Sequence, residues 1–348
     1  MRKLALLSLI LLVPIAFATA AVSAKQKPVR GARGTVWVTE RTPASSSVAA
    51  FDAATGDVLG WTPVGSTPIG VVVPRGSDYA YSSDEAADQL SVISRDTIKV
   101  VTTIPMGAAS RPHHMMASRN GKLIYVGEYN HNVVGVVDTE RNENVADFVA
   151  SRNPLAKTHA VWITRNGRDL YATNEGATQT SMGTLSKLDA RTGAIEWEID
   201  IGIRPSEVLV TRDGKTAYVS VRNENAIKVL NLCGHLPVVE SVVPIGEMPD
   251  TLQLTKDGDT LVVGLRAVPQ MAFMDTETLA VRPVKVDAHG ISGHEWLSRN
   301  GKVTFIALES PGSLAAIDTE TGAVLYDAPY PTKLLRPHGV FFEPRRLR

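Results

Sequence analysis

Short apolar runs that close on a polar residue recur along the whole chain. They end at positions 52, 94, 138, 189, 231, 275 and 318, so successive ends lie 42 to 51 residues apart. Upstream of each end is a segment with strand-like residues, such as 124–127 or 170–173, and an Asn-Gly or Asp-Gly pair introduces most of these segments. Such pairs between alternating apolar segments are strong hairpin signals. Each repeat of about forty residues is therefore expected to contain four short antiparallel strands.

Four short strands per repeat of this length are typical of a propeller blade. The repeats resemble those of the YVTN family of exported β-propellers: a Pro-led strand, an Asp-Gly or Asn-Gly turn, Tyr-Val as in 218–219, a strand closing on Asp, and Thr-Gly as in 192–193. The resemblance covers nearly the whole mature chain and implies a fold rather than one activity. We predict an all-β protein, a seven-bladed β-propeller that forms a single domain over 34–348 after a linker at 25–33.

The two ends of the chain complement each other. The first Tyr-Val-type strand, at 36–39, has no Pro-led strand before it, whereas the last segment, 336–342, is Pro-led and has no hairpin partner after it. The C-terminal segment is therefore predicted to supply the innermost strand of the first blade. Joining the ends in this way removes the exposed edges of an open sheet.

The N-terminal 24 residues have the order of a secretory signal peptide. A basic start, Met1-Arg2-Lys3, precedes an apolar stretch at 4–17. Two small-x-small cleavage motifs follow, ending at Ala20 and Ala24. We predict that residues 1–24 are cleaved, which places the protein in the periplasm or outside the cell without a stable membrane anchor. An uncleaved anchor is the alternative.

Composition narrows the classes of partner and cofactor. The chain of 348 residues has 36 basic and 36 acidic side chains, so a chain-wide field for nucleic acid is not expected. Its single cysteine, Cys233, excludes an internal disulfide, a multi-cysteine zinc site, an iron–sulfur cluster and a c-type haem attachment. We expect a monomer whose partner is a small molecule or a protein.

Propeller geometry predicts which residues meet. The innermost strand of each blade begins at the channel mouth where the second strand ends, and histidines are frequent there. Asp250, His294 and His338, on three contiguous blades, have the two-histidine, one-carboxylate composition that suits a divalent transition metal. His294 aligns one residue off when counted from its downstream turn, and since side chains alternate along a strand, that slip would reverse its direction. The position after the Pro residue is, by blade, His338, Ile69, His113, His159, Ser206, Asp250 and His294.

The second strand of each predicted blade ends with a charged residue at the same mouth. Arg222 and Arg266, on adjacent blades, are suited to clamping a carboxylate or phosphate, with inter-blade ion pairing as the alternative. Because exposed ion pairs contribute about 0–1 kcal/mol, replacing either arginine is expected to cost little stability. The predicted charged set is Glu40, Asp84 and Glu128 from blades 1 to 3 and, one position later, Glu175, Arg222, Arg266 and Glu309 from blades 4 to 7, of which Glu128, Glu175, Arg222, Arg266 and Glu309 are candidate ligand-binding residues.

The histidines and charged residues predicted at this channel mouth suggest two functions. The first is an exported binding protein that recognises a ligand or partner there. The alternative is a metal-dependent enzyme, an oxidoreductase or a lactone-type hydrolase, since related propeller groups include lactone hydrolases, haem-d1 domains and copper reductases. The sequence assigns no catalytic residue and leaves open whether the protein is an enzyme. Candidate ligands for a divalent transition metal are His113, His159, Asp250, His294 and His338.

Overall fold

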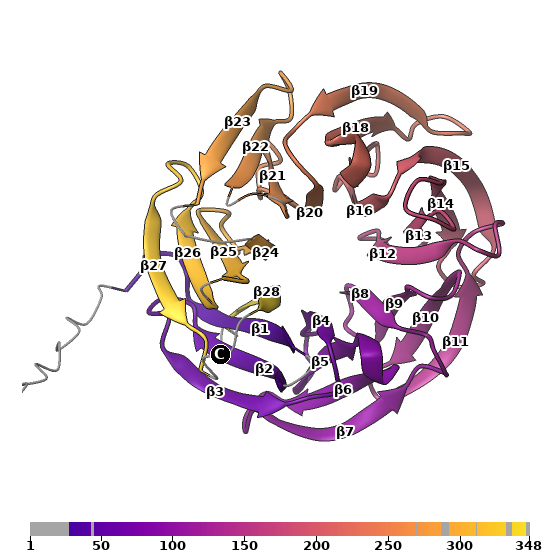
Figure 1. Cartoon of the computed structure of the whole chain (residues 1–348). Coiled ribbons are helices and arrows are strands. Elements are labelled where there is room, and N and C mark those ends of the chain that lie inside the picture. The colour runs from indigo at the N-terminus through magenta and orange to yellow at the C-terminus, as the bar shows by residue number, and fades with distance from the viewer. Residues whose placement is uncertain are drawn as a thin grey trace, which may run out of the picture.

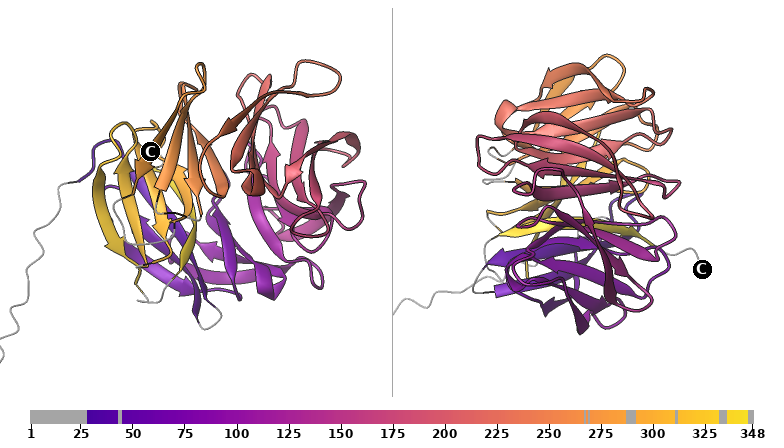
Figure 2. Two further views of the ribbon diagram at one scale, coloured as in Figure 1. Left: turned by 45° about the horizontal axis from the view of Figure 1, so that its top comes forward. Right: turned by 90° about the vertical axis from the view of Figure 1, so that its right-hand side faces the viewer.

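Seven four-stranded antiparallel sheets stand around a common axis in the computed structural model, which confirms the predicted seven-bladed β-propeller (Figure 1). The structure describes residues 28–42, 45–266, 268, 270–286, 292–310, 312–331 and 336–345. The predicted signal peptide at 1–24 lies outside these residues. Viewed from the side, the strands run across the thickness of the ring (Figure 2).

Blades are numbered here from the N-terminus, and each is built around one innermost strand. Blade 1 has the order β28-β1-β2-β3, and blades 2 to 7 each use four consecutive strands, starting with β4, β8, β12, β16, β20 and β24. The bounds are β1 Gly34–Thr42, β2 Ser45–Asp52, β3 Val58–Pro63, β4 Pro68–Val72, β5 Tyr79–Asp84, β6 Gln89–Ser94, β7 Lys99–Pro105, β8 Pro112–Ala117, β9 Leu123–Glu128, β10 Val133–Asp138, β11 Glu143–Val149, β12 Lys157–Ile163, β13 Asp169–Glu175, β14 Met182–Asp189, β15 Ile195–Ile203, β16 Pro205–Val210, β17 Thr216–Val221, β18 Ala226–Asn231, β19 Val238–Pro244, β20 Pro249–Leu254, β21 Thr260–Leu265, β22 Gln270–Asp275, β23 Val281–Lys285, β24 Ser292–Leu297, β25 Val303–Leu308, β26 Ser313–Asp318, β27 Val324–Pro329 and β28 Pro337–Pro344, with short 3-10 helices at Glu85–Ala87 and Arg222–Glu224.

Strand β28 closes the ring as predicted. It pairs with β1 from Gly34 opposite Pro344 to Glu40 opposite Pro337, although about three hundred residues separate the two strands. Their apolar side chains join one cluster with the neighbouring blade, in which Val36, Phe305 and Phe342 are buried. The innermost strand of blade 1 is therefore an integral part of the core.

The polar residue that closes each third strand builds the turn after it. The seven third strands end at the seven positions identified from the pattern, as β14 does at Asp189. The Asp189 carboxylate accepts bonds from the backbone N–H groups of Arg191 (3.0 Å) and Thr192 (2.7 Å), and Gly193 follows with a φ of +73°. Asp side chains favour such turns because they replace backbone partners, and glycine adopts positive φ without strain.

The segment before β1 packs onto the propeller. The N–H of Val29 donates to the carbonyl of Ala54 (2.7 Å), and Ala32 is fully buried between blades 1 and 7. Part of the segment predicted as a linker is thus fixed to the core. Across the described residues, no helix has the length and apolar character needed to span a membrane.

A β-bulge at the start of every innermost strand positions the site. In blade 3, Pro112 lies opposite Glu128 but Met115 lies opposite Val126, so the strand holds one extra residue there. The same shift occurs in the other six blades. A bulge sets two residues against one and re-aims their side chains. In blade 3 these two residues are His113 and His114, whose rings stack with centroids 4.8 Å apart.

Candidate functional site

An outer layer of seven residues, one from each blade, surrounds the channel mouth where the innermost strands begin, which we call the first mouth. Strand pairing shows that blades 1 to 3 contribute at the same position as the other blades, one residue after Glu40, Asp84 and Glu128. These three contributions therefore lie one residue later than predicted from the sequence. The ring is Arg41, Glu85, Tyr129, Glu175, Arg222, Arg266 and Glu309.

The three acidic residues predicted from blades 1 to 3 bond within their own blades. Glu40 accepts a bond from Ser47 (3.0 Å), and Asp84 accepts one from Ser82 (2.9 Å). Glu128 Oε2 lies 3.2 Å from Nδ1 of His131, three residues along the chain. Glu128 therefore lies apart from the other four predicted ligand-binding residues, which the structure brings into one network.

Asp250 is the centre of that network. Its Oδ1 accepts bonds from Arg222 and from the Ser206 hydroxyl, and its Oδ2 lies 3.4 Å from Nε of Arg266 and 3.8 Å from Nε2 of His294. Burial alone would raise the pKa of Asp250, but the charges of Arg222 and Arg266 outweigh it and hold that pKa well below its usual value. The predicted arginine clamp is thus filled by a carboxylate of the chain itself.

Arg222 also connects the centre to blades 3 and 4. Its Nη1 lies 3.3 Å from Oε1 of Glu175, and its Nη2 donates to Nε2 of His159 at 2.9 Å. The Tyr129 hydroxyl donates to the other oxygen of Glu175 (2.9 Å). His159 Nδ1 donates to the carbonyl of Ser206 (2.9 Å), so both ring nitrogens of His159 have partners and its tautomer is fixed.

His338 is held in the same way on the other side of the mouth. Its Nδ1 donates to Oε1 of Glu309 (2.8 Å), and its Nε2 accepts from Nη1 of Arg41 (3.2 Å). Arg266 Nη2 lies 3.5 Å from the same Glu309 oxygen and links this group back to Asp250. Inter-blade ion pairing, the alternative considered for the arginines, is what the structure shows.

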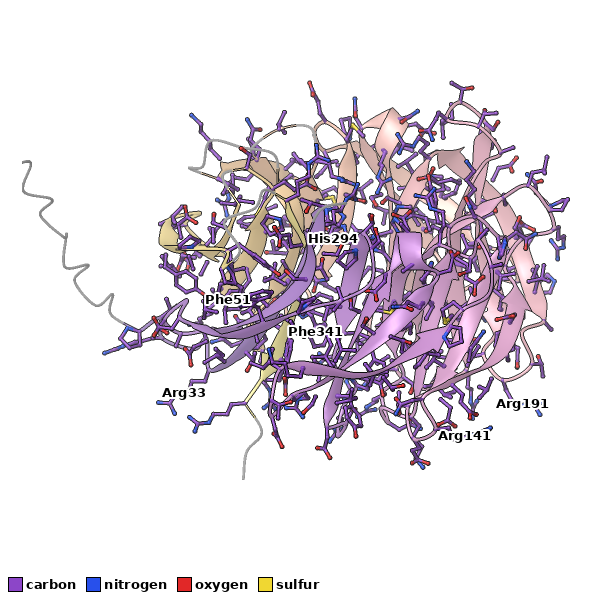
Figure 3. The ribbon with its side chains drawn as sticks, turned by 60° about the horizontal axis from the view of Figure 1, so that its bottom comes forward. Arg33, Phe51, Arg141, Arg191, His294 and Phe341 are labelled. Carbon is purple, nitrogen blue, oxygen red and sulfur yellow. The ribbon has the colours of Figure 1, made fainter. Side chains whose placement is uncertain are left out.

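Five histidines form a continuous inner layer beneath this ring. Neighbouring ring centroids are 4.2 Å apart between His294 and His338, 4.7 Å between His114 and His294, and 4.4 Å between His113 and His159. Strand pairing aligns His294 with His114, as counting from the downstream turn indicated. The expected reversal of its side chain was wrong, because the bulge turns both of its residues toward the channel; Figure 3 labels His294.

Four of these histidines are neutral in the folded protein. Burial lowers the pKa of His113, His159, His294 and His338 well below the usual value, and neighbouring cationic or histidine side chains lower it further. Neutral imidazole can accept a proton or bind a metal, depending on which nitrogen is free.

The free nitrogens decide how well a metal fits. His113, His114 and His159 could place one nitrogen each within 4.8 Å of one another. His113 Nδ1 and His114 Nε2 are buried without a hydrogen-bond partner among the described residues, but the nitrogens of His159 are engaged and one faces the Arg222 guanidinium. His338 and Asp250, from the predicted metal set, are likewise bonded to Arg41 and Arg222. A cation at either place would have to displace an arginine, so the donor sets fit a metal poorly.

A carboxylate–imidazole pair that sequence reasoning missed lies next to the histidine layer. Glu207, the second bulge residue of β16, accepts a bond from Nδ1 of His114 (3.2 Å), and this bond leaves Nε2 of His114 unpartnered. The signal was present in the sequence, since Glu207 follows Ser206 as His114 follows His113. The pair has the arrangement in which a carboxylate orients a histidine for proton transfer.

His114 and Glu207 line a small internal cavity of about 40 Å³ together with His294 and Glu295. The Thr251 hydroxyl donates to Glu295 Oε2, and Oε1 of the same side chain has no partner within the described part of the chain. Burial raises the pKa of Glu295 well above its usual value, which favours the protonated form of this carboxyl group. The cavity exceeds the roughly 10–15 Å³ that one water needs, and its walls offer several polar partners.

The comparisons with known proteins find a partial family match and several similar folds. The family described as "Lactonase, 7-bladed beta-propeller" matches residues 159–285. Among curated proteins, none matches the sequence. The narrower resemblance to YVTN repeats stays a prediction.

Solved propeller structures resemble the whole fold. A putative 6-phosphogluconolactonase from Bacteroides fragilis NCTC 9343 superposes with a TM-score of 0.69 and 18% identity, covering 90% of this chain and 98% of that one. The periplasmic gluconolactonase of Pseudomonas aeruginosa gives 0.68 and 17%, covering 89% and 98%. The hydrazine synthase of Kuenenia stuttgartiensis gives 0.68 and 18%, covering 86% and 98%. At these identities the likeness establishes the seven-bladed fold alone.

Proposed function

We propose that this protein is a hydrolase of lactone-type esters with His114 as its general base. The observation that carries the proposal is the free Nε2 of His114, which Glu207 orients into a cavity shared with His294 and Glu295. The partial match to the lactonase family and the two neighbours named as gluconolactonases support the same reaction class. The comparisons thus favour the enzyme alternative over the binding protein that the sequence analysis placed first.

The residues around the cavity supply the proton transfers of such a reaction. Water in the cavity gives a proton to Nε2 of His114 while its oxygen bonds to the ester carbonyl carbon. The bond from that carbon to the ring oxygen then breaks, and the leaving oxygen takes the proton that Glu295 holds. The proton on His114 returns to Glu295 through solvent, so that the net reaction is lactone plus water giving a hydroxy acid.

The charged ring at the first mouth orders this centre without taking part in proton transfer. Arg222 fixes His159 and Asp250, and Asp250 lies 3.8 Å from Nε2 of His294. His113, His114 and His294 are 8%, 8% and 6% exposed, so the inner layer borders the solvent of the channel. The proposal includes export, which the predicted signal peptide and the periplasmic location of one neighbour support.

The test is hydrolysis of a panel of aldonolactones and simple γ- and δ-lactones, followed by pH-stat titration and corrected for spontaneous opening. His114→Gln is expected to lower kcat by about 10²- to 10⁴-fold, the usual contribution of a general base. Glu207→Gln acts through His114, so it is expected to shift the pH profile of kcat/KM as well as to lower kcat. His131→Gln, a half-exposed histidine outside the inner layer, is the matched control and is expected to keep full activity.

Two outcomes would overturn the proposal. One is that no lactone in the panel opens above the spontaneous rate in a protein whose circular dichroism spectrum and thermal transition show it to be folded. The other is that His114→Gln retains the wild-type rate. Dialysis against EDTA separates the predicted metal-dependent enzyme from the acid–base enzyme, because only the former loses activity that added zinc, copper, iron or manganese restores.

A further inference from the structure

A much larger cavity lies at the opposite end of the channel. It lies where the innermost strands end and turn into the second strands, which we call the second mouth, and its volume is about 830 Å³. Ligand pockets usually measure about 300–1,000 Å³. None of the functional residues discussed above lines it.

Six cationic side chains surround this cavity at one repeated position. Each lies seven residues after the residue that precedes the bulge, as Arg75 does after Pro68 and Arg119 after Pro112. Six consecutive blades, 2 to 7, contribute one cation each. The set, called here the cationic rim, is Arg75, Arg119, Arg165, Arg212, Lys256 and Arg299, all of them exposed.

The charge of the cationic rim is only partly balanced within the described residues, because two carboxylates stand in the lining against six cations. No member of the rim forms an ion pair or a side-chain hydrogen bond among the interactions resolved there. The two acidic residues of the lining, Asp213 and Asp257, bond to their own turns, Asp213 to the Thr211 hydroxyl (2.6 Å) and Asp257 to the Thr255 hydroxyl (2.6 Å). Like charges around a concave surface reinforce one another's field and attract anions.

The floor of the cavity carries apolar side chains, which add a second requirement on the ligand. Beneath the cationic rim the lining includes Met116, Trp162, Leu209, Leu254 and Leu297. Trp162 and Leu254 are only partly buried and so remain available for contact. A small inorganic anion would satisfy the rim but leave this floor exposed to water. A body with an apolar face would cover the floor and gain from the area that it buries.

We propose that the second mouth binds a small organic polyanion, several carboxylate, phosphate or sulfate groups on a compact apolar body. The anionic groups meet the arginines and the lysine of the cationic rim, and the body covers the apolar floor. Arginine guanidinium groups suit this role because they bind carboxylates and phosphates through two parallel hydrogen bonds. The inference is independent of the proposed hydrolase, since it concerns other residues and is measured as binding.

The experiment is isothermal titration calorimetry of the full chain with benzene-1,3,5-tricarboxylate at low ionic strength. We expect saturable one-to-one binding that weakens as salt is raised, because screening reduces the attraction of exposed charges. Propane-1,2,3-tricarboxylate has the same charge without the aromatic face and is expected to bind at least fivefold more weakly. Sulfate at equal ionic strength is expected to compete poorly.

Two double variants remove the same charge from one face of the molecule. Arg165→Gln with Arg212→Gln removes two neighbours of the cationic rim and is expected to weaken binding at least tenfold. Arg141→Gln with Arg191→Gln, in the outer turns at the edge of the molecule (Figure 3), is expected to change it less than twofold. Equal losses in both variants, no saturable binding, or equal affinity for sulfate and for the aromatic tricarboxylate would each overturn the proposal.

Discussion

Arg222 of blade 5 and Asp250 of blade 6 form a buried ion pair, with Arg222 Nε 3.2 Å from Asp250 Oδ1. Each of the two partners also bonds a histidine or a serine that starts an innermost strand. Neither charge reaches solvent to any extent, since Arg222 is 3% and Asp250 0% exposed. A feature that the sequence suggested as a ligand clamp is thereby part of the framework that holds the inner histidines.

Replacing Arg222 by alanine is expected to destabilise the protein strongly. Removing one partner of a buried pair leaves the other charge without compensation, which costs about 3–5 kcal/mol. This corrects the expectation of little cost, which assumed exposed ion pairs. The side chain of Arg266 is 22% exposed, so replacing it by alanine is expected to lower the free energy of unfolding by about 1 kcal/mol. Urea titrations of Arg222→Ala and Arg266→Ala measure the difference, with Arg191→Ala as the exposed control. A loss below 1 kcal/mol for Arg222→Ala would contradict the prediction.

The buried histidines predict a steep loss of stability in acid. Their pKa values in the folded protein lie well below the unfolded value of about 6.5, so the unfolded chain binds more protons as the pH falls. The free energy of unfolding should therefore fall below about pH 6.5, by up to about 1.4 kcal/mol per pH unit for each such histidine. His294→Gln should reduce the slope between pH 6 and 5 by about one proton, as measured by denaturant unfolding. An unchanged slope in this variant would count against neutral His294, and His131→Gln serves as the control.

The raised pKa of Glu128 is expected to make the free energy of unfolding fall as the pH rises, the opposite of the effect of the histidines. Burial, followed by the charges of Asp147 and Asp88, raises the pKa of Glu128 to about 8. The folded state binds its proton more tightly than the unfolded chain does, so stability should fall as the pH rises from about 4.3 to 8. Glu128→Gln should stabilise the protein at pH 9 by about 2–5 kcal/mol, since each pKa unit corresponds to about 1.4 kcal/mol, and have no effect at pH 4. Equal effects of Glu128→Gln and of Glu143→Gln, an exposed control, at pH 9 would contradict the assignment.

Deleting the last innermost strand should abolish folding. A chain ending at 336 lacks β28, which exposes the inner edge of β1 and removes the buried side chains of Val340 and Phe342. We expect loss of the cooperative thermal transition in calorimetry. The control ends at 345 and retains the whole of β28. A truncation at 336 that unfolds at the wild-type temperature would show that closure is dispensable.

Removing metal should leave the fold unchanged. Since His159 and His338 use both ring nitrogens in hydrogen bonds, the first mouth is ordered by ion pairs of the chain itself. Dialysis against EDTA and re-addition of zinc or copper are expected to shift the thermal midpoint by less than about 1 °C. Elemental analysis that finds a stoichiometric metal in dialysed wild type, lost in His113→Gln, would contradict this prediction.

The blade plan was predictable because its signals are local. A strand closed by Asp189 carries its turn in the next four residues, and Pro337 marks the start of an inner strand without reference to distant contacts. The regular spacing of the repeats also identified a strand whose own signal is weak. One example is the strand that ends at Ser94, where most other blades have an acidic residue.

The site was only partly predictable because it depends on one-residue registers. The bulge turns both His113 and His114 to the channel, which strict alternation along a strand forbids, and it places Glu207 beside His114. Inter-blade ion pairing was considered for the arginines, but nothing local shows that Arg222 of one blade meets Asp250 of the next. Arg41 and Tyr129 were not predicted, because Glu40 and Glu128 were taken as the residues at the mouth. The ring residue is the next one along the chain in both blades.

The pairing of β1 with β28 also constrains when the ring can form. The first strand to emerge during synthesis has to wait for one of the last before its inner edge is covered. Contacts between such distant segments form slowly, because a long loop must close before they contribute. Completion of the first blade is therefore a late, post-translational step, because the strand that it lacks is among the last to be made.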